Sequence, residues 1–280
     1  MRMSEIDVNR NQRVYDAPDV VAHYAGLEYL TPCERLLFET HIPPRSAVLD
    51  LGVGGGRTTP FLAKRASRYI GIDYAPAMIK ACQARFPDLE FLPGNAADLS
   101  KFGDGSFQAA VFAFNGIDYV PAAVRNKCFE EIRRVLKAGG VFIFSSHNPR
   151  AVLMRARWNR DRLHGVAQNV ARKMRLPQSL IYIPMFFFRL VWANVHAFCG
   201  TLMRLVRWLP SRMFWKGEGE RLDPVHGGLL THYAVPEKVI AELVSLRFRL
   251  VQVLGSDYPE RSHLYATGWY YYVFSRPGEK

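Results

Sequence analysis

The sequence predicts an α/β fold with a seven-stranded, mostly parallel sheet and helices on both of its faces. Short apolar segments, each long enough for one strand, alternate with segments long enough for a helix. A glycine-rich turn follows the first apolar segment, and an acidic residue ends the second. The alternation stops after residue 149 and resumes at residue 236, so we expect a helical insertion between the fifth strand and the next helix.

The glycine-rich turn follows the predicted first strand, residues 46–51, which contains Asp50. Its spaced glycines are Gly52, Gly54 and Gly56. A strand, a glycine turn and a helix in this order let a nucleoside lie against the backbone, because no Cβ atom intervenes. A tight turn without a ligand is the alternative for such a glycine cluster alone.

The second predicted strand, residues 69–73, ends in Asp73, which lies 23 residues after Asp50. This spacing leaves room for one helix and one strand between the two acids. An acid at the end of the second strand of a βαβ unit can accept hydrogen bonds from both ribose hydroxyls of an adenosine. The alternative is that Asp73 caps the helix that begins near Pro76.

The remaining predicted elements continue the alternation. We expect further strands over residues 89–93, 107–114, 140–146, 248–254 and 268–275. We expect helices over residues 17–25, 31–41, 59–66, 75–86, 122–135 and 236–246. Thr31 and Glu34 predict a capping box at the second of these helices.

Four parts of the chain follow from these elements. They are N-terminal leader helices (1–45), a core (46–149), a basic, aromatic-rich helical insertion (150–230) and a C-terminal part of the core (231–280). Ligands of parallel sheets bind beyond the carboxyl ends of the strands. The residues expected along that edge are Asp50, Asp73, Asn95, Asn115 and His147.

Four segments stand in order along the core: DLGVGGG from Asp50, GIDYAPAMIKACQARFP from Gly71, LPGNAADLSKFGDGSFQAAVF from Leu92 and EEIRRVLKAGGVFIFSS from Glu130. Together they resemble the class I S-adenosylmethionine-dependent methyltransferases. The resemblance covers residues 47–148 closely and residues 232–276 loosely. It implies a Rossmann-like fold, S-adenosylmethionine as the cofactor and methyl transfer as the activity.

The resemblance also implies which residues bind the cofactor. Asp73 matches the ribose position and Met78 the apolar residue that flanks the adenine. The family usually has an acid where this chain has Asn95, whose amide oxygen can still accept from the adenine amino group; Asp98 could substitute for it. The implied cofactor-binding residues are Asp50, Gly52, Gly54, Gly56, Asp73, Tyr74, Met78, Asn95, Ala96 and Asn115.

Methyl transfer to a hydroxyl needs a base, and three residues are candidates: His147, Asp118 and His232. His147 follows the fifth predicted strand, and a neutral imidazole near pH 7 suits a base. Asp118 follows the fourth. The alternative for His147 is a hydrogen bond that holds the loop before Pro149, and the alternative for Asp118 is a helix cap.

His226 and His232 lack further ligands at metal-binding spacing, so we expect no metal.

The net charge of +12 is concentrated in the insertion. Residues 150–221 contain 14 Lys and Arg but only three acids, whereas the rest of the chain contains 23 basic and 22 acidic residues. Residues 176–210 are rich in aromatics, and their uncharged runs are shorter than the roughly 20 residues of a spanning helix. Such a segment suits a helix on an anionic membrane, a lid over an apolar substrate or a homodimer contact. RNA binding and a plain helical subdomain with solvated arginines are the alternatives.

The four cysteines are scattered and predict no disulfide framework, and the N-terminus lacks the apolar core of a signal peptide. We therefore expect a cytoplasmic methyltransferase, peripheral on the inner face of the membrane, that O-methylates a glycan, a lipid or a small metabolite. The cofactor motifs suit N- and C-methylation equally. An RNA methyltransferase and a non-catalytic, methyltransferase-like partner protein are the alternative functions.

Overall fold

The computed structural model describes residues 11–149, 219–223, 229–260 and 267–278. All of them belong to one compact unit, Met1–Ala151 with Gly217–Lys280. The second unit, Val152–Lys216, lies outside the described residues, and with it most of the predicted insertion.

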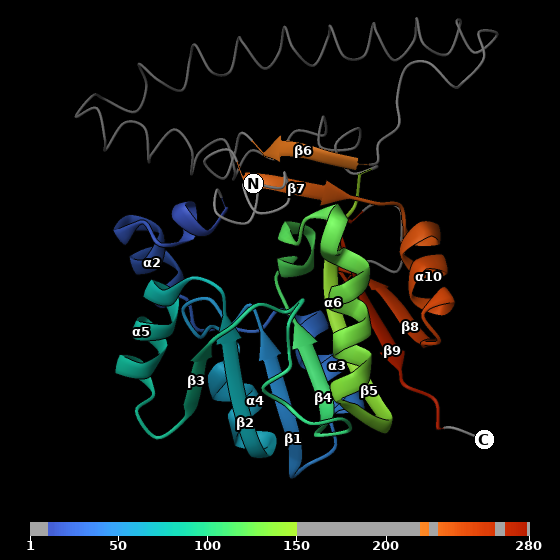
Figure 1. Cartoon of the computed structure of the whole chain (residues 1–280), viewed down its shortest axis with the longest axis horizontal. Helices are drawn as coiled ribbons and strands as arrows, with labels where there is room; N and C mark the ends of the chain where they lie inside the picture. Colours follow the sequence, from blue (N-terminus) through green and yellow to red (C-terminus); the bar gives the residue numbers. More distant parts are fainter. Residues whose placement is uncertain (1–10, 150–218, 224–228, 261–266, 279–280) are drawn as a thin grey trace, which may run out of the picture. The chain divides into compact units, whose positions relative to one another are not determined.

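A seven-stranded sheet in the order β3-β2-β1-β4-β5-β9-β8 forms the centre of the described unit (Figure 1). Its strands are β1 (Ser46–Leu51), β2 (Ala66–Asp73), β3 (Glu90–Pro93), β4 (Phe107–Phe112), β5 (Leu136–His147), β8 (Arg249–Gly255) and β9 (Trp269–Ser275). β9 runs antiparallel to both of its neighbours, β5 and β8, and the other strand pairs are parallel. The predicted seven-stranded, mostly parallel sheet is confirmed.

Helices cover both faces of the sheet, because the strands alternate buried side chains between two apolar clusters. Leu49 of β1 packs in the cluster that contains α6 (Ala122–Val135) and α10 (Pro236–Ser245). Its neighbour Val48 packs in the cluster on the other face, which contains α3 (Pro32–His41), α4 (Thr59–Arg65) and α5 (Pro76–Arg85). This burial on both faces explains why the parallel strands are apolar almost throughout.

The strand order reverses between β1 and β4, which lie side by side in the middle of the sheet. The chain leaves β1 toward α4 on one face and leaves β4 toward α6 on the other. The two connections therefore diverge at the carboxyl ends of the strands and leave a crevice between them.

Several predicted boundaries shift by a few residues. β4 ends at Phe112, two residues earlier than predicted, because Phe114 and Asn115 adopt the left-handed region with φ of 55° and 62°. A short 3-10 helix, η1 (Gly116–Tyr119), follows and was not predicted. β2 and β5 begin earlier than predicted, at Ala66 and Leu136.

The predicted helical character of residues 150–230 is wrong at the end of that segment. Residues Gly219–Asp223 (β6) and Leu229–Tyr233 (β7) form a two-stranded antiparallel ribbon. Leu229 and Thr231 of β7 are buried, as expected where alternate side chains face the protein. The Glu220 side chain of β6 accepts a hydrogen bond from the backbone N–H of Ala122, the first residue of α6.

The leader is joined to the glycine turn by a buried ion pair. The Arg57 guanidinium donates to both carboxylate oxygens of Glu34 at 2.8 and 2.6 Å, and both residues are buried. Glu34 also completes the predicted capping box with Thr31 at the start of α3. A single carboxylate thus fixes the start of α3 and neutralises a cation beside the crevice.

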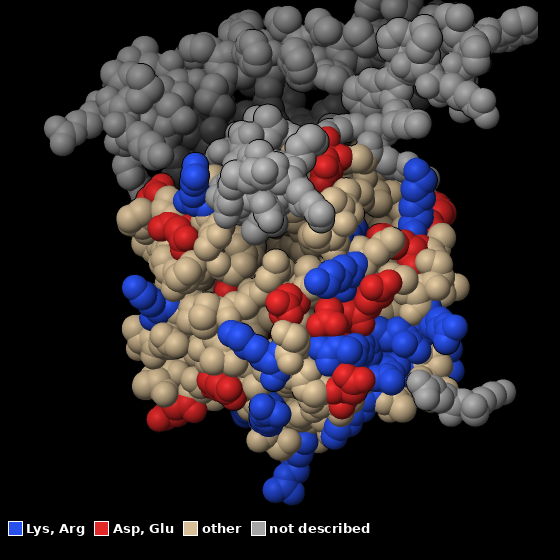
Figure 2. Space-filling model, in the orientation of Figure 1, with Lys and Arg blue, Asp and Glu red and all other residues tan. Residues whose placement is uncertain are grey.

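The charged residues outside the insertion do not form a patch of one sign on the face shown in Figure 2, where Lys and Arg lie among Asp and Glu. Arg134, for example, pairs with both Asp104 and Glu131. Among the helices that the structure describes, none is long and apolar enough to cross a bilayer.

Replacing Glu34 with alanine should lower the free energy of unfolding by about 3–5 kcal/mol, because Arg57 would remain buried without a counter-charge. Urea denaturation followed by circular dichroism measures the change. Glu39→Ala is the matched control. Glu39 forms an exposed pair with Arg35 on the same helix, so its loss should cost about 0.5 kcal/mol or less. Equal effects of the two substitutions would contradict this role for the buried pair.

Candidate functional site

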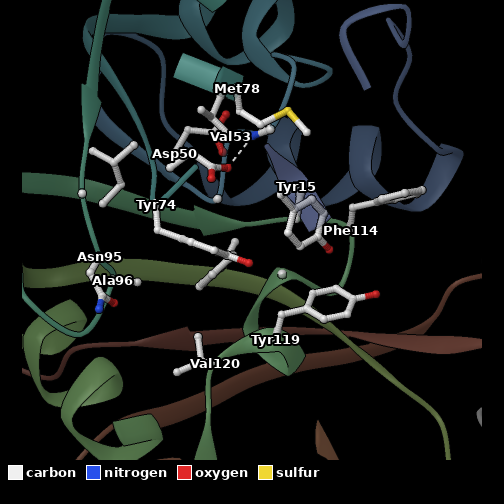
Figure 3. Close-up of a pocket in the computed structure, with 18 of the residues that line it drawn as sticks. Tyr15, Asp50, Val53, Tyr74, Met78, Asn95, Ala96, Phe114, Tyr119 and Val120 are labelled. Atoms are coloured by element: carbon white, nitrogen blue, oxygen red, sulfur yellow. Dashed lines mark hydrogen bonds between the residues drawn. The ribbon is translucent and has the colours of Figure 1, made fainter. Parts of the chain in front are cut away.

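A cavity opens at the carboxyl ends of β1 and β4, where the strand order reverses (Figure 3). The glycine turn, the ends of β2 and β4, the segments after β3 and β4, the start of α6 and the leader all contribute to its wall. Its empty space totals about 1090 Å³, including the part open to solvent.

The glycine turn presents bare backbone to the cavity. Gly52 and Gly54 line it, with φ of 59° and 56° in the left-handed region that favours glycine. Gly56 also has a positive φ but is not among the lining residues, and a Cβ there would lie 2.7 Å from the Phe86 ring. Of the three glycines singled out in the sequence, two therefore face the cavity and the third shapes the turn.

Gly55 cannot carry a side chain, because the leader packs directly against it. A Cβ on Gly55 would lie 2.3 Å from backbone atoms of both Tyr24 and Ala25, at the end of α2 (Pro18–Ala25). The leader therefore packs directly against the glycine turn. Asp16 strengthens this contact, because its carboxylate accepts a hydrogen bond from the backbone N–H of Ala77 in the first turn of α5.

Asp73 lies at the end of β2 and lines the cavity. Its Oδ2 accepts from the backbone N–H of Gly54 at 2.9 Å, and its Oδ1 accepts from that of Ala75 at 2.9 Å, immediately before α5. The two predictions for this acid, a place in the ligand site and a role at the helix start, are thus compatible. Burial raises the pKa of Asp73 to about 6.

Asp50 reaches the cavity wall, but its carboxylate is directed to other groups. Its Oδ2 accepts hydrogen bonds from the hydroxyls of Thr58 and Tyr69, each at 2.8 Å. Burial raises the pKa of Asp50 to about 6 as well. This acid therefore links the glycine turn to β2, and only part of it faces the cavity.

Tyr74, Met78, Asn95 and Ala96 all line the cavity. Their contact with an adenine or a ribose stays a prediction. The amide oxygen of Asn95 accepts from the backbone N–H of Ala97 at 2.9 Å. Asp98, the predicted substitute for Asn95, is not among the lining residues, and its carboxylate accepts from the backbone N–H of Ser100.

The leader closes the cavity with aromatic rings. Tyr15 makes edge-to-face contacts with Tyr24, Tyr74 and Tyr119, at centroid distances of 5.9, 6.1 and 5.8 Å, and all four rings line the cavity. The leader tyrosines therefore contribute to the site itself. No periodicity in the sequence brings Tyr15 to Tyr119, so this grouping was not predicted.

Asn11 connects the start of the leader to β7, which lies more than 200 residues later in the sequence. Its amide group both donates to and accepts from the backbone of Leu230 in β7, at 3.0 and 2.9 Å. The same amide nitrogen lies 3.4 Å from the carbonyl oxygen of Tyr119 in η1. Asn11 also lines the cavity, although nothing in its sequence context marks it as a site residue.

Two of the three predicted base candidates form one hydrogen-bonded pair. The His147 Nδ1 lies 2.8 Å from Oδ2 of Asp118, and the backbone N–H of His147 donates to the same oxygen at 2.7 Å. Ser146 Oγ donates to the other carboxylate oxygen at 2.7 Å. The buried Arg125 lies 3.9 Å from that oxygen and supports a negative charge on Asp118.

Asn115 belongs to this pair rather than to the cavity wall. Its Nδ2 lies 3.3 Å from Nε2 of His147, and Asn115 is not among the lining residues, although its neighbours Phe114 and Gly116 are. Within the described part of the chain, its buried Oδ1 has no hydrogen-bond partner. His147 therefore does not line the cavity, and it lies beside Asn115 and beside the ring of the lining residue Tyr119.

His232, the third candidate, lies on β7 in register with Glu220 and is not among the lining residues. The described residues contain no group of three or more His, Cys, Asp or Glu arranged to hold a metal ion.

Comparison with known sequences places this site in a family. Residues 48–140 match the family model described as a methyltransferase domain. An uncharacterized methyltransferase of Synechocystis sp. is 32% identical over 109 residues, which are 39% of this chain and 50% of that protein. Residues 48–140 therefore form a methyltransferase domain. The chain spans about half the length of this relative.

Solved structures share the fold of this methyltransferase domain. One is the Burkholderia thailandensis 1,6-didemethyltoxoflavin-N1-methyltransferase with bound 1,6-didemethyltoxoflavin and S-adenosylhomocysteine. Its TM-score is 0.58 at 13% sequence identity, and the superposition covers 99% of this chain and 92% of that enzyme's chain. The [4+2]-cyclase SpnF has a TM-score of 0.57 at 12% identity and covers 98% and 97%. The same fold therefore supports more than one reaction, and only the site can argue for one of them.

The raised pKa of Asp73 predicts a pH dependence of ligand binding by the methyltransferase domain. If the ionised carboxylate accepts from ribose hydroxyls, the affinity for S-adenosylhomocysteine should fall about tenfold from about pH 7.5 to about pH 5, where only about a tenth of the carboxyl is ionised. Asp73→Asn should bind weakly at both pH values, whereas Asp50→Asn should keep the pH dependence. Isothermal titration calorimetry measures both, and a flat wild-type profile would contradict the prediction.

The stability of the unliganded protein should depend on pH with the opposite sign. The folded-state pKa of Asp73 lies above the value of about 3.9 for an unfolded aspartate, so the folded state holds the proton more tightly. The contribution of Asp73 to the free energy of unfolding is therefore full below about pH 4 and is lost as the pH rises through about 6.

Proposed function

We propose that this protein is an S-adenosylmethionine-dependent methyltransferase that methylates a hydroxyl group of a small molecule. One observation carries the proposal: at the switch point of the sheet, Asp73 binds the backbone of the glycine turn inside a cavity lined by Gly52 and Gly54. The cofactor supplies a sulfonium-bound, electrophilic methyl group. The protein has to hold that methyl group, orient the acceptor and exclude water.

The residues around the cavity fit this cofactor. Gly52 and Gly54 leave room for the backbone to touch the ligand, and each oxygen of Asp73 keeps a lone pair for a ribose hydroxyl beside the hydrogen bond it already accepts. Met78 offers an apolar surface to the adenine, and Tyr74 a buried hydroxyl without a partner among the described residues. Asn95 and Ala96 lie on the same side of the view as Tyr74, and we propose that all four residues bind the same ligand (Figure 3).

His147 is the base that the geometry supports best. Because Asp118 is a carboxylate, it fixes the proton of the His147 ring on Nδ1, and Nε2 is left with the lone pair that a base requires. In the structure this lone pair faces the amide nitrogen of Asn115 at 3.3 Å, a long hydrogen bond that an acceptor hydroxyl can replace. Asp118 is then the residue that orients the base.

The other candidates receive less support. Asp118 is buried and already accepts hydrogen bonds from Ser146 and His147, so it is placed to orient a base. Neither His147 nor His232 is among the lining residues, but the His147 ring lies beside that of the lining residue Tyr119. Docking of the insertion on a membrane, contact with RNA and dimer formation depend on residues outside the described part of the chain and remain predictions.

The cofactor assignment predicts the effect of two substitutions in the cavity. Gly54→Arg should abolish binding of S-adenosylhomocysteine, because a side chain would enter the cavity from a backbone with a positive φ. Asp73→Ala should weaken binding by about tenfold or more, through loss of charge-assisted hydrogen bonds. Calorimetric titration measures both. Gly139→Ala, at a positive-φ glycine of β5 remote from the cavity, controls for strain alone. Unchanged affinity in both cavity variants would refute the assignment.

The base assignment predicts a separation of turnover from binding. His147→Ala should lower kcat by about 100-fold or more on the best acceptor found in a panel of phenols and alcohols, with an unchanged affinity for S-adenosylhomocysteine. Asp118→Asn should also lower kcat, because the ring would lose its fixed tautomer. His41→Ala removes a histidine that bonds to Gln252 away from the cavity and is the control. Full activity of His147→Ala would exclude it as the base.

A further inference from the structure

The end of the cavity away from the adenine position differs in chemistry from the cofactor end. Asn95 and Ala96 lie at one end, and Phe114 and Tyr119 at the other (Figure 3). Around that second end, the lining side chains carry no charge: Tyr15, Phe114, Tyr119 and Val120 lie there, and the Asn11 amide lies 3.4 Å from the carbonyl oxygen of Tyr119. We call this set the neutral wall.

Three charged side chains line the cavity in the described part of the chain, and each already has partners. Asp50 and Asp73 belong to the glycine turn and accept the hydrogen bonds described above. Arg57 is paired with Glu34, donates to the carbonyl of Tyr29 and lies under the ring of Phe114 at 4.8 Å. No described lining residue therefore offers a free charge to an acceptor.

The tyrosine hydroxyls do not supply a charge either. Burial raises the pKa of Tyr15 and Tyr74 well above the ordinary value, so both phenols stay protonated at neutral pH. They can orient a ligand through hydrogen bonds, and their rings offer flat surfaces for an aromatic partner. The unpartnered hydroxyl of Tyr74 is one such group within the described residues.

Resting on the proposed function, we infer that the methyl acceptor is an uncharged, hydroxylated aromatic compound, of the phenol or hydroquinone class, bound against the neutral wall. An anionic acceptor would lose its hydration without a counter-charge. A cationic acceptor would lie beside the sulfonium charge at the end of the cavity that lacks an acid. A glycan would need partners for many hydroxyls, whereas the neutral wall offers few polar groups.

The acceptor hydroxyl loses its proton to Nε2 of His147 as its oxygen attacks the methyl carbon, and the carbon–sulfur bond of the cofactor breaks. The products are the methyl ether, neutral S-adenosylhomocysteine and a protonated imidazole stabilised by Asp118. The proton then passes to solvent, which reaches the side chain of His147, 13% of which is exposed. A neutral product beside a neutral wall leaves no charge attraction to delay release.

The test compares ligands of one shape and different charge on the full-length protein saturated with S-adenosylhomocysteine. Catechol is the neutral probe, 3,4-dihydroxybenzoate the anion and 3,4-dihydroxybenzylamine the cation; methyl glucoside represents a glycan. We expect catechol to bind at least about tenfold more tightly than each of the others. Binding is measured by calorimetry and by saturation-transfer NMR.

Two lysine substitutions supply the matched variants. Val120→Lys places a cation in the neutral wall and should shift the preference toward the benzoate by about tenfold or more, whereas Ala123→Lys places it on a nearby exposed position and should change nothing. Preference for a charged probe or for the glucoside, or absence of catechol binding by the S-adenosylhomocysteine complex, would overturn the inference. Failure to bind S-adenosylhomocysteine at all would instead overturn the proposed function.

Discussion

The carboxylate of Asp73 holds the site together. It binds the backbone of Gly54 in the turn after β1 and that of Ala75 before α5, so one side chain connects three elements of the fold. Both bonds form in a buried setting that disfavours the charge they use. The glycine turn, the first turn of α5 and the leader that packs on both therefore depend on a group that is also suited to bind a ligand.

The strands of the sheet could be predicted from the sequence because local patterns determine them, whereas their order in the sheet was not predicted. Segments such as Ser46–Leu51 are apolar, of strand length and followed by turn residues, and α6 matches its predicted bounds. The positions of Asp50 and Asp73 at strand ends follow directly. The left-handed conformation of Phe114 could not be predicted in this way, because a bulky residue disfavours it without tertiary contacts.

The rest of the site depends on contacts between distant residues. Asn11, Tyr15 and Tyr119 meet only after the leader has folded over the sheet, and no spacing in the sequence encodes that meeting. The hydrogen bond between His147 and Asp118 could not be predicted from the sequence either, because the sequence only indicated that each of them could be the base. The β6–β7 ribbon lies in a segment whose basic and aromatic composition suggested helices, although its short stretch of alternating residues is typical of strands.

The bridge between Asn11 and Leu230 has a consequence for biosynthesis. The two residues are 219 positions apart, so Asn11 emerges from the ribosome long before its partner exists. During translation the strands from β1 to β5 can pair while the first residues of the chain still lack their anchor. The anchor of the aromatic cover can therefore form only after Leu230 has been synthesised, when the five strands β1 to β5 are already complete and β8 and β9 are still to come.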